Sequence, residues 1–319
     1  RGAIDFDSTE TSIVFNDKGK IDFIKPIYRN EAHRIIEECM LSANVCAANY
    51  LLDNPGDGIY RNHETPSEEK LTNLRDFLLD FGLTLGGGSE PTVKDYGEIL
   101  KKIANRPDAH LLQTVLLRSM QQASYSSKNL GHFGLAYSAY THFTSPIRRY
   151  PDLMVHRAIK SQLDGKNPKI KNIEAIALHC STTERTADDA TRDVESWLKC
   201  YFMQDKVGDS FWGTVAGVTG FGLFIELDDI YIEGLLHVTE LGNDYFTFDK
   251  ARHAMVGEKT NLTYRLGDRL EIKVIRVDLD SIKIDLGLIG SQKKPSKKFK
   301  KSFIRAEKSK KKIKRRKKK

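Results

Sequence analysis

The sequence predicts an α+β fold with three parts: a helix-rich segment, a five-stranded barrel and a disordered basic tail. Helical periodicity fills most of residues 31–203. Five short β-like runs separated by glycine-rich turns follow, and lysine and arginine dominate the final residues. We therefore expect a first domain at residues 1–204, a second at 205–288 and a tail at 289–319.

Composition is ordinary for a globular protein with room for two domains. Of the 319 residues, 39% are hydrophobic. No apolar run approaches the roughly 18 residues that a membrane span requires. The four cysteines lack metal-ligand spacing, so we expect reduced thiols in a cytoplasmic protein. We expect a monomer with no membrane partner.

Charge is distributed unevenly along the chain. Residues 293–319 contain 17 Lys or Arg and one acid, whereas the remaining residues include 34 basic and 42 acidic ones. Such a tail repels itself and has little to bury, which predicts disorder. A polyanion such as RNA is the expected partner, because counterion release would supply affinity. A nuclear-localisation signal or a solubility tail is the alternative.

The first elements are strands. The run AIDFD alternates apolar and acidic residues, and a hairpin is predicted around Asn16–Gly19. Because a domain seldom begins with its sheet under way, we expect a fragment of a larger domain.

Helices follow. Asn30 should cap a helix from Glu31 to about Leu52, and a capping box at Thr65 should begin another that ends at Gly82. The first helix is expected to bury one face, formed by Ile35, Ile36, Cys39, Met40, Ala43 and Ala47. Further helices are expected at Val93–Asn105, Ala109–Gln122, Asp152–Leu163 and Ile173–Met203, with an irregular loop at Ser124–Tyr140.

The stretch from Ser145 to Tyr150 contains Pro146 and is followed by Pro151, and the two prolines oppose a regular helix between them. A bent, rigid corner is therefore expected, with Arg148 and Arg149 projecting from it. Guanidinium groups on a rigid corner suit phosphate recognition, because the planar fork pairs two oxygens and keeps its charge. A solvated turn whose arginines pair with nearby acids is the alternative.

The strand-rich part fits a five-stranded barrel of the OB type, with an excursion at residues 243–267. A bulge at Gly222 would bring Phe221 and Phe224 to one face beside His237, where aromatic rings could stack on single-stranded bases. Core packing of the phenylalanines is the alternative. The order G-F-G-x-F followed by G-L-L-H closely resembles the RNA-binding domain named after the first protein of the small ribosomal subunit. That resemblance implies RNA contacts at all three side chains.

A second resemblance covers residues 1 to about 203. It rests on RGAIDFD, RNEAHRIIEECMLSANVCAA, LLRSMQQASYS, GHFGLAYSAYTHFTSPIRRYPDLMVHRAI and ERTADDATRDVESWL. These runs resemble the second part of the catalytic domain of the ribonuclease II family of processive 3′-to-5′ exoribonucleases. The resemblance implies a narrow channel that delivers the 3′ end of single-stranded RNA to two magnesium ions.

The family match assigns roles residue by residue. Arg148 matches the arginine that contacts the scissile phosphate, and Arg149 and Tyr150 beside it are candidate RNA contacts. Phe6 matches the aromatic residue that stacks on the last bases, although a core position would show the same pattern. Glu38 matches an acid that helps bind the terminal nucleotide. For that acid Glu37, one residue away, and an exposed helix face remain alternatives.

Five further residues are weaker candidates. Asp152 could simply cap its helix. His156 and Arg157 could contact backbone phosphates or pair with the acids of ERTADD, and His132 and Phe133 could line the channel.

Two-metal hydrolysis needs a tight cluster of carboxylates. The family match places four aspartates in one short motif ahead of the matched segment, and nothing here replaces it. Asp5 and Asp7 form only a lone D-x-D, and Asp188, Asp189 and Asp193 share a helix face only in part. We therefore expect Mg²⁺ dependence for the parent protein, metal ligands mostly outside this chain, and no activity of the chain alone.

The leading hypothesis is thus a part of an exoribonuclease that hydrolyses single-stranded RNA to nucleoside 5′-monophosphates. The alternative is a non-catalytic fragment that binds RNA or the ribosome through the barrel and the tail. A phosphorolytic enzyme is disfavoured, because the helical domain resembles a hydrolase.

Overall fold

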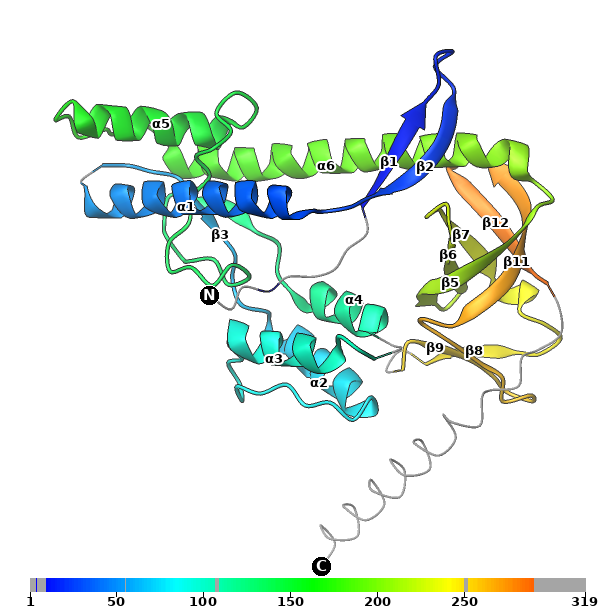
Figure 1. Ribbon diagram of the computed structural model, residues 1–319. Coiled ribbons are helices and arrows are strands. Elements are labelled where there is room, and N and C mark those ends of the chain that lie inside the picture. The colour runs from blue at the N-terminus through cyan, green and yellow to red at the C-terminus, as the bar shows by residue number, and fades with distance from the viewer. Residues whose placement is uncertain (1–3, 5–9, 55, 107–108, 250–251, 290–319) are drawn as a thin grey trace, which may run out of the picture.

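The computed structural model describes residues 4, 10–54, 56–106, 109–249 and 252–289. A helical part contains the two neighbouring helices α1 and α5, and the long helix α6 runs from it to the barrel (Figure 1). The α+β class and the closed five-stranded barrel predicted from the sequence are confirmed. Phe6, Asp5, Asp7 and the basic tail lie outside the described residues.

The helices lie close to their predicted positions. They are α1 (Glu31–Asp53), α2 (Glu68–Asp80), α3 (Val93–Ile103), α4 (Ala109–Ser119), α5 (Tyr150–Leu163) and α6 (Ile173–Met203), with 3₁₀ turns at Gln204–Lys206 and Val238–Glu240. The predicted hairpin is also present, as β1 (Glu10–Phe15) paired antiparallel with β2 (Ile21–Ile27). A small sheet of β3 (Tyr60–Asn62) and β4 (Ser124–Ser126) was not predicted. Its three-residue strands are too short to give an alternating pattern.

Helix α1 begins as predicted but buries a different set of residues. The Asn30 side chain accepts a hydrogen bond from the backbone N–H of His33 at 3.1 Å. Ile35 and Ile36, expected in the core, are 64% and 60% exposed, and Cys39 is exposed. Burial starts only in the second half of α1, where Ala47 packs against α5. Helical periodicity placed these apolar residues on one face of α1. Whether that face is buried depends on which other segments pack against it.

The N-cap of helix α2 lies two residues later than predicted. Ser67, rather than Thr65, has the cap conformation, and its hydroxyl accepts from the backbone N–H of Lys70 at 3.5 Å. The predicted end is confirmed, since Gly82 adopts a positive φ of 71° and donates its N–H to the carbonyl of Leu79.

The barrel has the strand order β11-β12-β7-β6-β5 and closes through β11 and β5. Its strands are β5 (Ser210–Thr219), β6 (Gly222–Leu227), β7 (Glu233–His237), β11 (Arg269–Asp278) and β12 (Lys283–Leu288). Every pair is antiparallel except β12 with β7. Leu223, Ile225 and Leu227 alternate along β6 and are fully buried, so the residues between them face outward.

The predicted excursion forms a second sheet of β8 (Phe246–Asp249), β9 (Ala254–Gly257) and β10 (Thr263–Arg265). Beside it, the imidazole of His253 meets the ring of Phe77 on α2 edge-on, with centroids 5.3 Å apart. The core of α2, α3 and α4 is continuous with the barrel core. The excursion therefore fixes the barrel against the three helices.

Two negative findings apply to the part of the chain that the structure describes. None of its helices is long and apolar enough to cross a membrane. The cysteines are free thiols, with Cys39 and Cys46 exposed and Cys180 and Cys200 buried.

Candidate nucleic-acid interface

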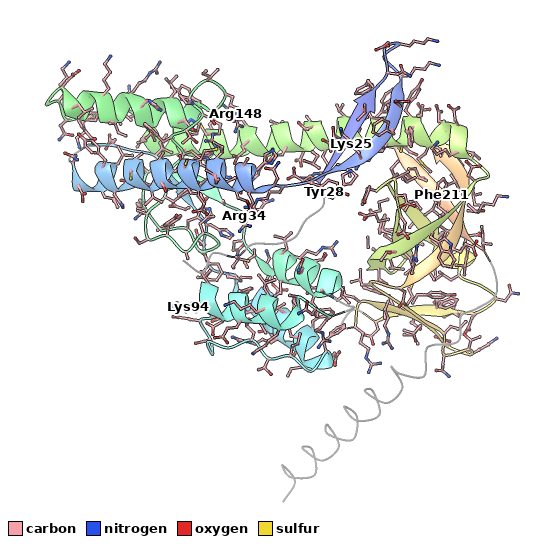
Figure 2. All side chains as sticks on the ribbon, in the orientation of Figure 1. Lys25, Tyr28, Arg34, Lys94, Arg148 and Phe211 are labelled. Carbon is pink, nitrogen blue, oxygen red and sulfur yellow. The ribbon has the colours of Figure 1, made fainter. Side chains whose placement is uncertain are left out.

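The predicted corner is present between the two prolines. The carbonyl of Ser145 accepts the backbone N–H groups of Arg148 and Arg149 at 3.3 and 3.0 Å, which closes a single turn. Arg149 caps α5, and Pro151 lies in the first turn of the helix. Arg148 is exposed at the end of α5 that faces the hairpin (Figure 2). No ion pair to Arg148 is found within the described ranges.

The buried carboxylate of Asp152 stabilises this corner. Its side chain is fully buried, and Oδ1 accepts both the backbone N–H of Ser145 at 2.8 Å and the guanidinium of Arg149 at 2.7 Å. Arg149 is only 18% exposed, so its described contact is structural. Arg149 Nε and Asp152 Oδ2 are buried without a hydrogen-bond partner among the described residues. Sequence reasoning treated Asp152 as a weak candidate, because no local pattern shows that a carboxylate at the start of a helix will be buried.

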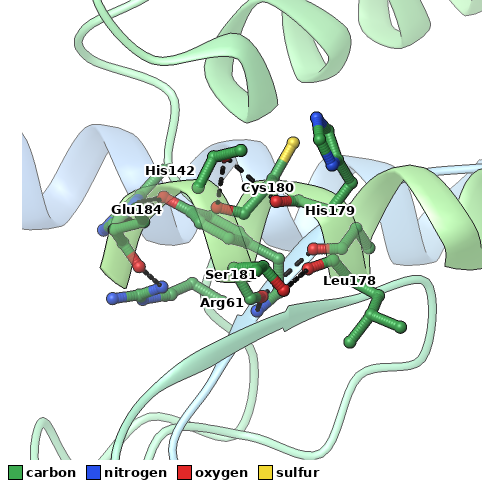
Figure 3. A network of polar contacts seen from close by, with 11 residues as sticks. Arg61, His142, Leu178, His179, Cys180, Ser181 and Glu184 are labelled. Carbon is green, nitrogen blue, oxygen red and sulfur yellow. Dashed lines mark hydrogen bonds and ion pairs between the residues drawn. The ribbon is translucent and has the colours of Figure 1, made fainter. Parts of the chain in front are cut away.

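A polar network lies behind the corner (Figure 3). The hydroxyl of Tyr125 lies 2.8 Å from Nδ1 of His142 and donates to Glu184 at 3.4 Å. Arg61 pairs with the same carboxylate at 2.6 Å and lies over the Tyr125 ring at 4.6 Å. The network joins β3, β4 and α6 to His142, and so it fixes the segment that leads into the corner.

A second set of contacts ties the corner to α1 and α5. Asn44 is buried and bonds the Tyr140 hydroxyl at 2.8 Å and the backbone N–H of Phe143 at 2.9 Å. His156 lies 2.8 Å from the carbonyl of Phe143, and the two rings stack 4.0 Å apart. His156 therefore positions the chain before the corner, and no ion pair to the ERTADD acids is found for it or for Arg157 among the described residues.

Burial controls the protonation of this region. It lowers the pKa of His142 to about 2, with further lowering by the charges of Arg149 and Arg61, and it lowers the pKa of His132 to about 3. Burial also raises the pKa of the Tyr125 hydroxyl. Near neutral pH these rings are therefore uncharged. The positive charge at the corner comes from its arginines.

The two acids of the EE pair have different surroundings. Glu37 pairs with the guanidinium of Arg29, with one Nε–Oε1 distance of 3.0 Å. Glu38 is exposed on the next position of α1. The assignment of Glu38 to the terminal nucleotide stays a prediction, as do the roles of Arg149 and Tyr150, which is half exposed at the first position of α5.

The loop candidates divide between the core and a cavity. Phe133 packs edge-on against Tyr96, with centroids 5.7 Å apart, and contributes to the core of the three helices. His132 instead lines an open cavity of about 800 Å³. Sequence reasoning missed the basic residues of this cavity, which are Lys70, Arg118 and Arg185. They come from three separate helices, so no sequence spacing groups them.

On the barrel, the predicted aromatic group forms by a different route. No bulge occurs at Gly222, because Phe221 lies in the turn that precedes β6. Phe221 is 50% exposed, and its ring meets that of Phe224 edge-on with centroids 5.9 Å apart. Gly222 pairs with the exposed His237 across β6 and β7, so Phe224 and His237 face outward together. We call Phe221, Phe224 and His237 the aromatic patch.

Gly222 and Gly217 make this patch possible. A Cβ at Gly222 would collide with the carbonyl oxygen of Leu236 and lie 3.0 Å from Cα of His237. A Cβ at Gly217 would lie 3.3 Å from Cβ of Phe224, whose ring lies across that glycine. The only register irregularity between these strands is in β5, between Val215 and Gly217.

The residues that the structure describes do not fit a divalent metal. They contain no group of three or more His, Cys, Asp or Glu side chains placed to hold an ion. Asp189 on α6 is exposed and lies 3.9 Å from Arg192, as expected for a solvated helix face.

Comparison with known proteins places the chain in a family. The model of the RNB domain matches residues 1–165, and that of the S1 RNA binding domain matches residues 204–289. The first match covers more than half of the chain, and the chain belongs to the RNB family. The predicted resemblances to the ribonuclease II family and to the RNA-binding domain are thereby confirmed. This family implies dependence on divalent metal ions.

The chain is similar to Ribonuclease R. It is 47% identical over 308 residues to Ribonuclease R of Escherichia coli (strain K12), and the match covers 92% of this chain and 38% of that relative. The structure matches the apo form of Mycoplasma genitalium RNase R with a TM-score of 0.84 at 30% identity, covering 90% of this chain and 46% of the other. The structure also matches the complex of that enzyme with ribose methylated single-stranded RNA, with a TM-score of 0.83 at 31% identity and the same coverage. The chain thus spans about two fifths of the length of its curated relative.

Proposed function

We propose that this chain is the RNA-binding and phosphate-positioning part of a processive 3′-to-5′ exoribonuclease. Its reaction is the hydrolysis of single-stranded RNA to nucleoside 5′-monophosphates. The observation that carries the proposal is the exposed Arg148 on a corner fixed by the buried Asp152. A guanidinium on such a base needs no rearrangement to meet charge that develops on a phosphate.

The roles divide between the two parts of the chain. Arg148 contacts the scissile phosphate, Glu38 and Phe6 contact the terminal nucleotides, and Arg149 and Tyr150 are further RNA contacts. The aromatic patch on the barrel holds RNA by stacking before it reaches the corner. Mg²⁺ is the metal we propose, with ligands outside the described residues. The division at residues 204 and 288, a cytoplasmic location, a monomeric state and a further contact of the basic tail with the ribosome belong to the same proposal.

A chimera tests the proposal directly. In it, this chain replaces the matching segment of Escherichia coli Ribonuclease R, and 5′-labelled and 3′-labelled single-stranded RNAs are supplied with Mg²⁺. The 5′-labelled RNA should pass from full length to a short labelled end product with few intermediates, and the 3′-labelled RNA should release a labelled mononucleotide at once. Arg148→Ala should lower kcat by about 100- to 1,000-fold, the range seen when one transition-state donor is removed.

Lys160→Ala provides the matched control, because Lys160 is an exposed cation in the last turn of the same helix. It should leave kcat within about twofold of the unsubstituted chimera, as is usual for surface substitutions away from a site. Equal turnover of the Arg148→Ala and unsubstituted chimeras would overturn the assigned role. Shortening from the 5′ end would overturn the polarity.

A further inference from the structure

The cavity beside α4 is separate from the corner. Leu117, Arg118 and Met120 at the end of α4 line it together with Lys70 of α2 and Arg185 of α6, and it is open to solvent. His132 also lines the cavity, and its ring contacts Tyr140, which in turn contacts the ring of His142. The ring centroids of His132 and Tyr140 lie 5.2 Å apart, and those of Tyr140 and His142 lie 5.8 Å apart. None of the residues from Ser145 to Asp152 is among the described lining residues, so the cavity is distinct from the Arg148 corner.

The charged residues found to line the cavity are cationic. They are Lys70, Arg118 and Arg185, and no carboxylate is found among the lining residues that the structure describes. This is a local exception, because the chain outside its basic tail has more acids than bases. The ammonium of Lys70 is held by the carbonyl of Met120 at 2.7 Å. Arg118 and Arg185 are exposed, and neither has an ion pair within 4.0 Å in the described part of the chain. Two guanidinium groups are thus available to an anion.

The inner wall is uncharged and partly aromatic. His63 accepts the backbone N–H of Gly134 at Nδ1, 2.9 Å away, and its Nε2 then donates to the carbonyl of Gln121 at 2.7 Å. His63 and His132 are in ring contact at 5.0 Å, and burial lowers the pKa of both. Met120 and Leu117 add apolar surface. Neutral rings beside apolar side chains suit the stacking of a base.

We propose that this cavity binds a nucleotide unit, with its phosphate between Arg118 and Arg185 and its base against the histidine wall. The inference deepens the proposed function, since RNA or its product would supply the nucleotide. The source is either a phosphodiester of a bound strand or a released nucleoside 5′-monophosphate. Both present the same phosphate, and the guanidinium fork pairs with either.

The test measures equilibrium binding of the full chain without metal, so that no turnover is needed. One probe is a fluorescein-labelled oligoadenylate followed by anisotropy, and the other is AMP followed by calorimetry. Arg185→Gln and Arg118→Gln each remove one cation from the cavity. Lys101→Gln on α3 is the control, because it removes one exposed cation outside the cavity. Circular dichroism checks that each variant is folded, and Arg185, on an exposed stretch of α6, is the safer of the two sites.

If the cavity binds the strand, each cavity variant should weaken oligoadenylate binding about 3- to 10-fold and reduce the salt slope by about 0.7, the value for one phosphate contact on a single strand. If it binds the product, AMP affinity should fall by a similar factor, and AMP should compete with the oligonucleotide. The Lys101→Gln chain should bind both probes as the unsubstituted chain does.

Unchanged binding of both probes by Arg185→Gln and Arg118→Gln would overturn the inference, and so would the absence of any binding to the unsubstituted chain. Failure of the proposed function looks different. In that case the cavity variants still weaken binding, while Arg148→Ala leaves the turnover of the chimera unchanged.

Discussion

The Arg148 corner and the aromatic patch present side chains to solvent in contrasting ways. The corner is held by the buried carboxylate of Asp152, and the segment before it is held from distant parts of the chain by Asn44 and the Tyr125 network. The patch depends on a turn and two glycines within one hairpin. A group that must meet a reacting phosphate needs a fixed position, whereas a stacking platform tolerates small shifts. We therefore expect the corner to fail through stability and the patch to fail through affinity.

Asp152→Ala should have the largest effect and should break the corner. It leaves the guanidinium of Arg149 buried and unpaired, which costs about 3–5 kcal/mol of the free energy of unfolding. Urea unfolding followed by circular dichroism measures the loss. Asp189→Ala is the control, since this exposed carboxylate should cost less than about 1 kcal/mol. Equal unfolding midpoints for the two variants would contradict the importance of the buried pair.

Phe221→Ala should separate affinity from stability on the patch. Removing one stacking ring should weaken binding to single-stranded RNA by about 1–3 kcal/mol, or about 5- to 150-fold. The unfolding midpoint should hardly move, because the ring is half exposed. Anisotropy titrations measure the affinity. Tyr245→Ala, at the residue before β8 and more exposed than Phe221, should bind RNA normally. A large loss of stability without loss of affinity would show that Phe221 is a core residue.

Gly222→Ala should sharpen the comparison, because it tests whether the patch depends on backbone approach. The new Cβ would press on the carbonyl oxygen of Leu236, and overpacking of this kind costs about 1–3 kcal/mol. Gly220→Ala, two residues away, is the matched control, since nothing lies within 4 Å of its added Cβ. The free energies of unfolding of the two variants should differ by about 1–3 kcal/mol. The affinity for RNA should fall only for Gly222→Ala. If the two variants had the same free energy of unfolding and the same RNA affinity, the strands could separate at Gly222 without cost.

We also expect a pH dependence of stability from the rings behind the corner. The pKa of His142 is lowered from the ordinary value of 6.5 to about 2, and that of His132 to about 3. As the pH falls, the unfolded chain therefore protonates these two histidines at a higher pH than the folded chain does. Stability present above about pH 6.5 is then lost as the pH falls, by up to about 1.4 kcal/mol per pH unit for each histidine.

Unfolding in urea between about pH 6.5 and 5, above the range of ordinary carboxylates, measures this slope. His142→Gln should reduce the slope by one histidine's share, whereas His179→Gln, on an exposed position of α6, should leave it unchanged. A slope that His142→Gln does not alter would show that His142 is protonated in the folded chain.

Local sequence was sufficient for the elements themselves. The hairpin turn at Asn16–Gly19, the Asn30 cap and the span of α6 follow from residues within a few positions of one another. The two prolines likewise predicted the corner, because they act on their own backbone and on that of the preceding residue. The order of aromatic and glycine residues in the barrel identified its RNA-binding relatives.

Tertiary structure decided the surroundings of those elements. It paired Arg61 with Glu184 across 123 positions and buried Asp152. It also left Ile35 exposed on an apolar face and gathered the cations of the cavity from three helices. Backbone conformation is set largely by neighbours along the chain, so a sequence shows it directly. Burial and charge pairing depend on which distant segments pack together, and no spacing in the sequence records that.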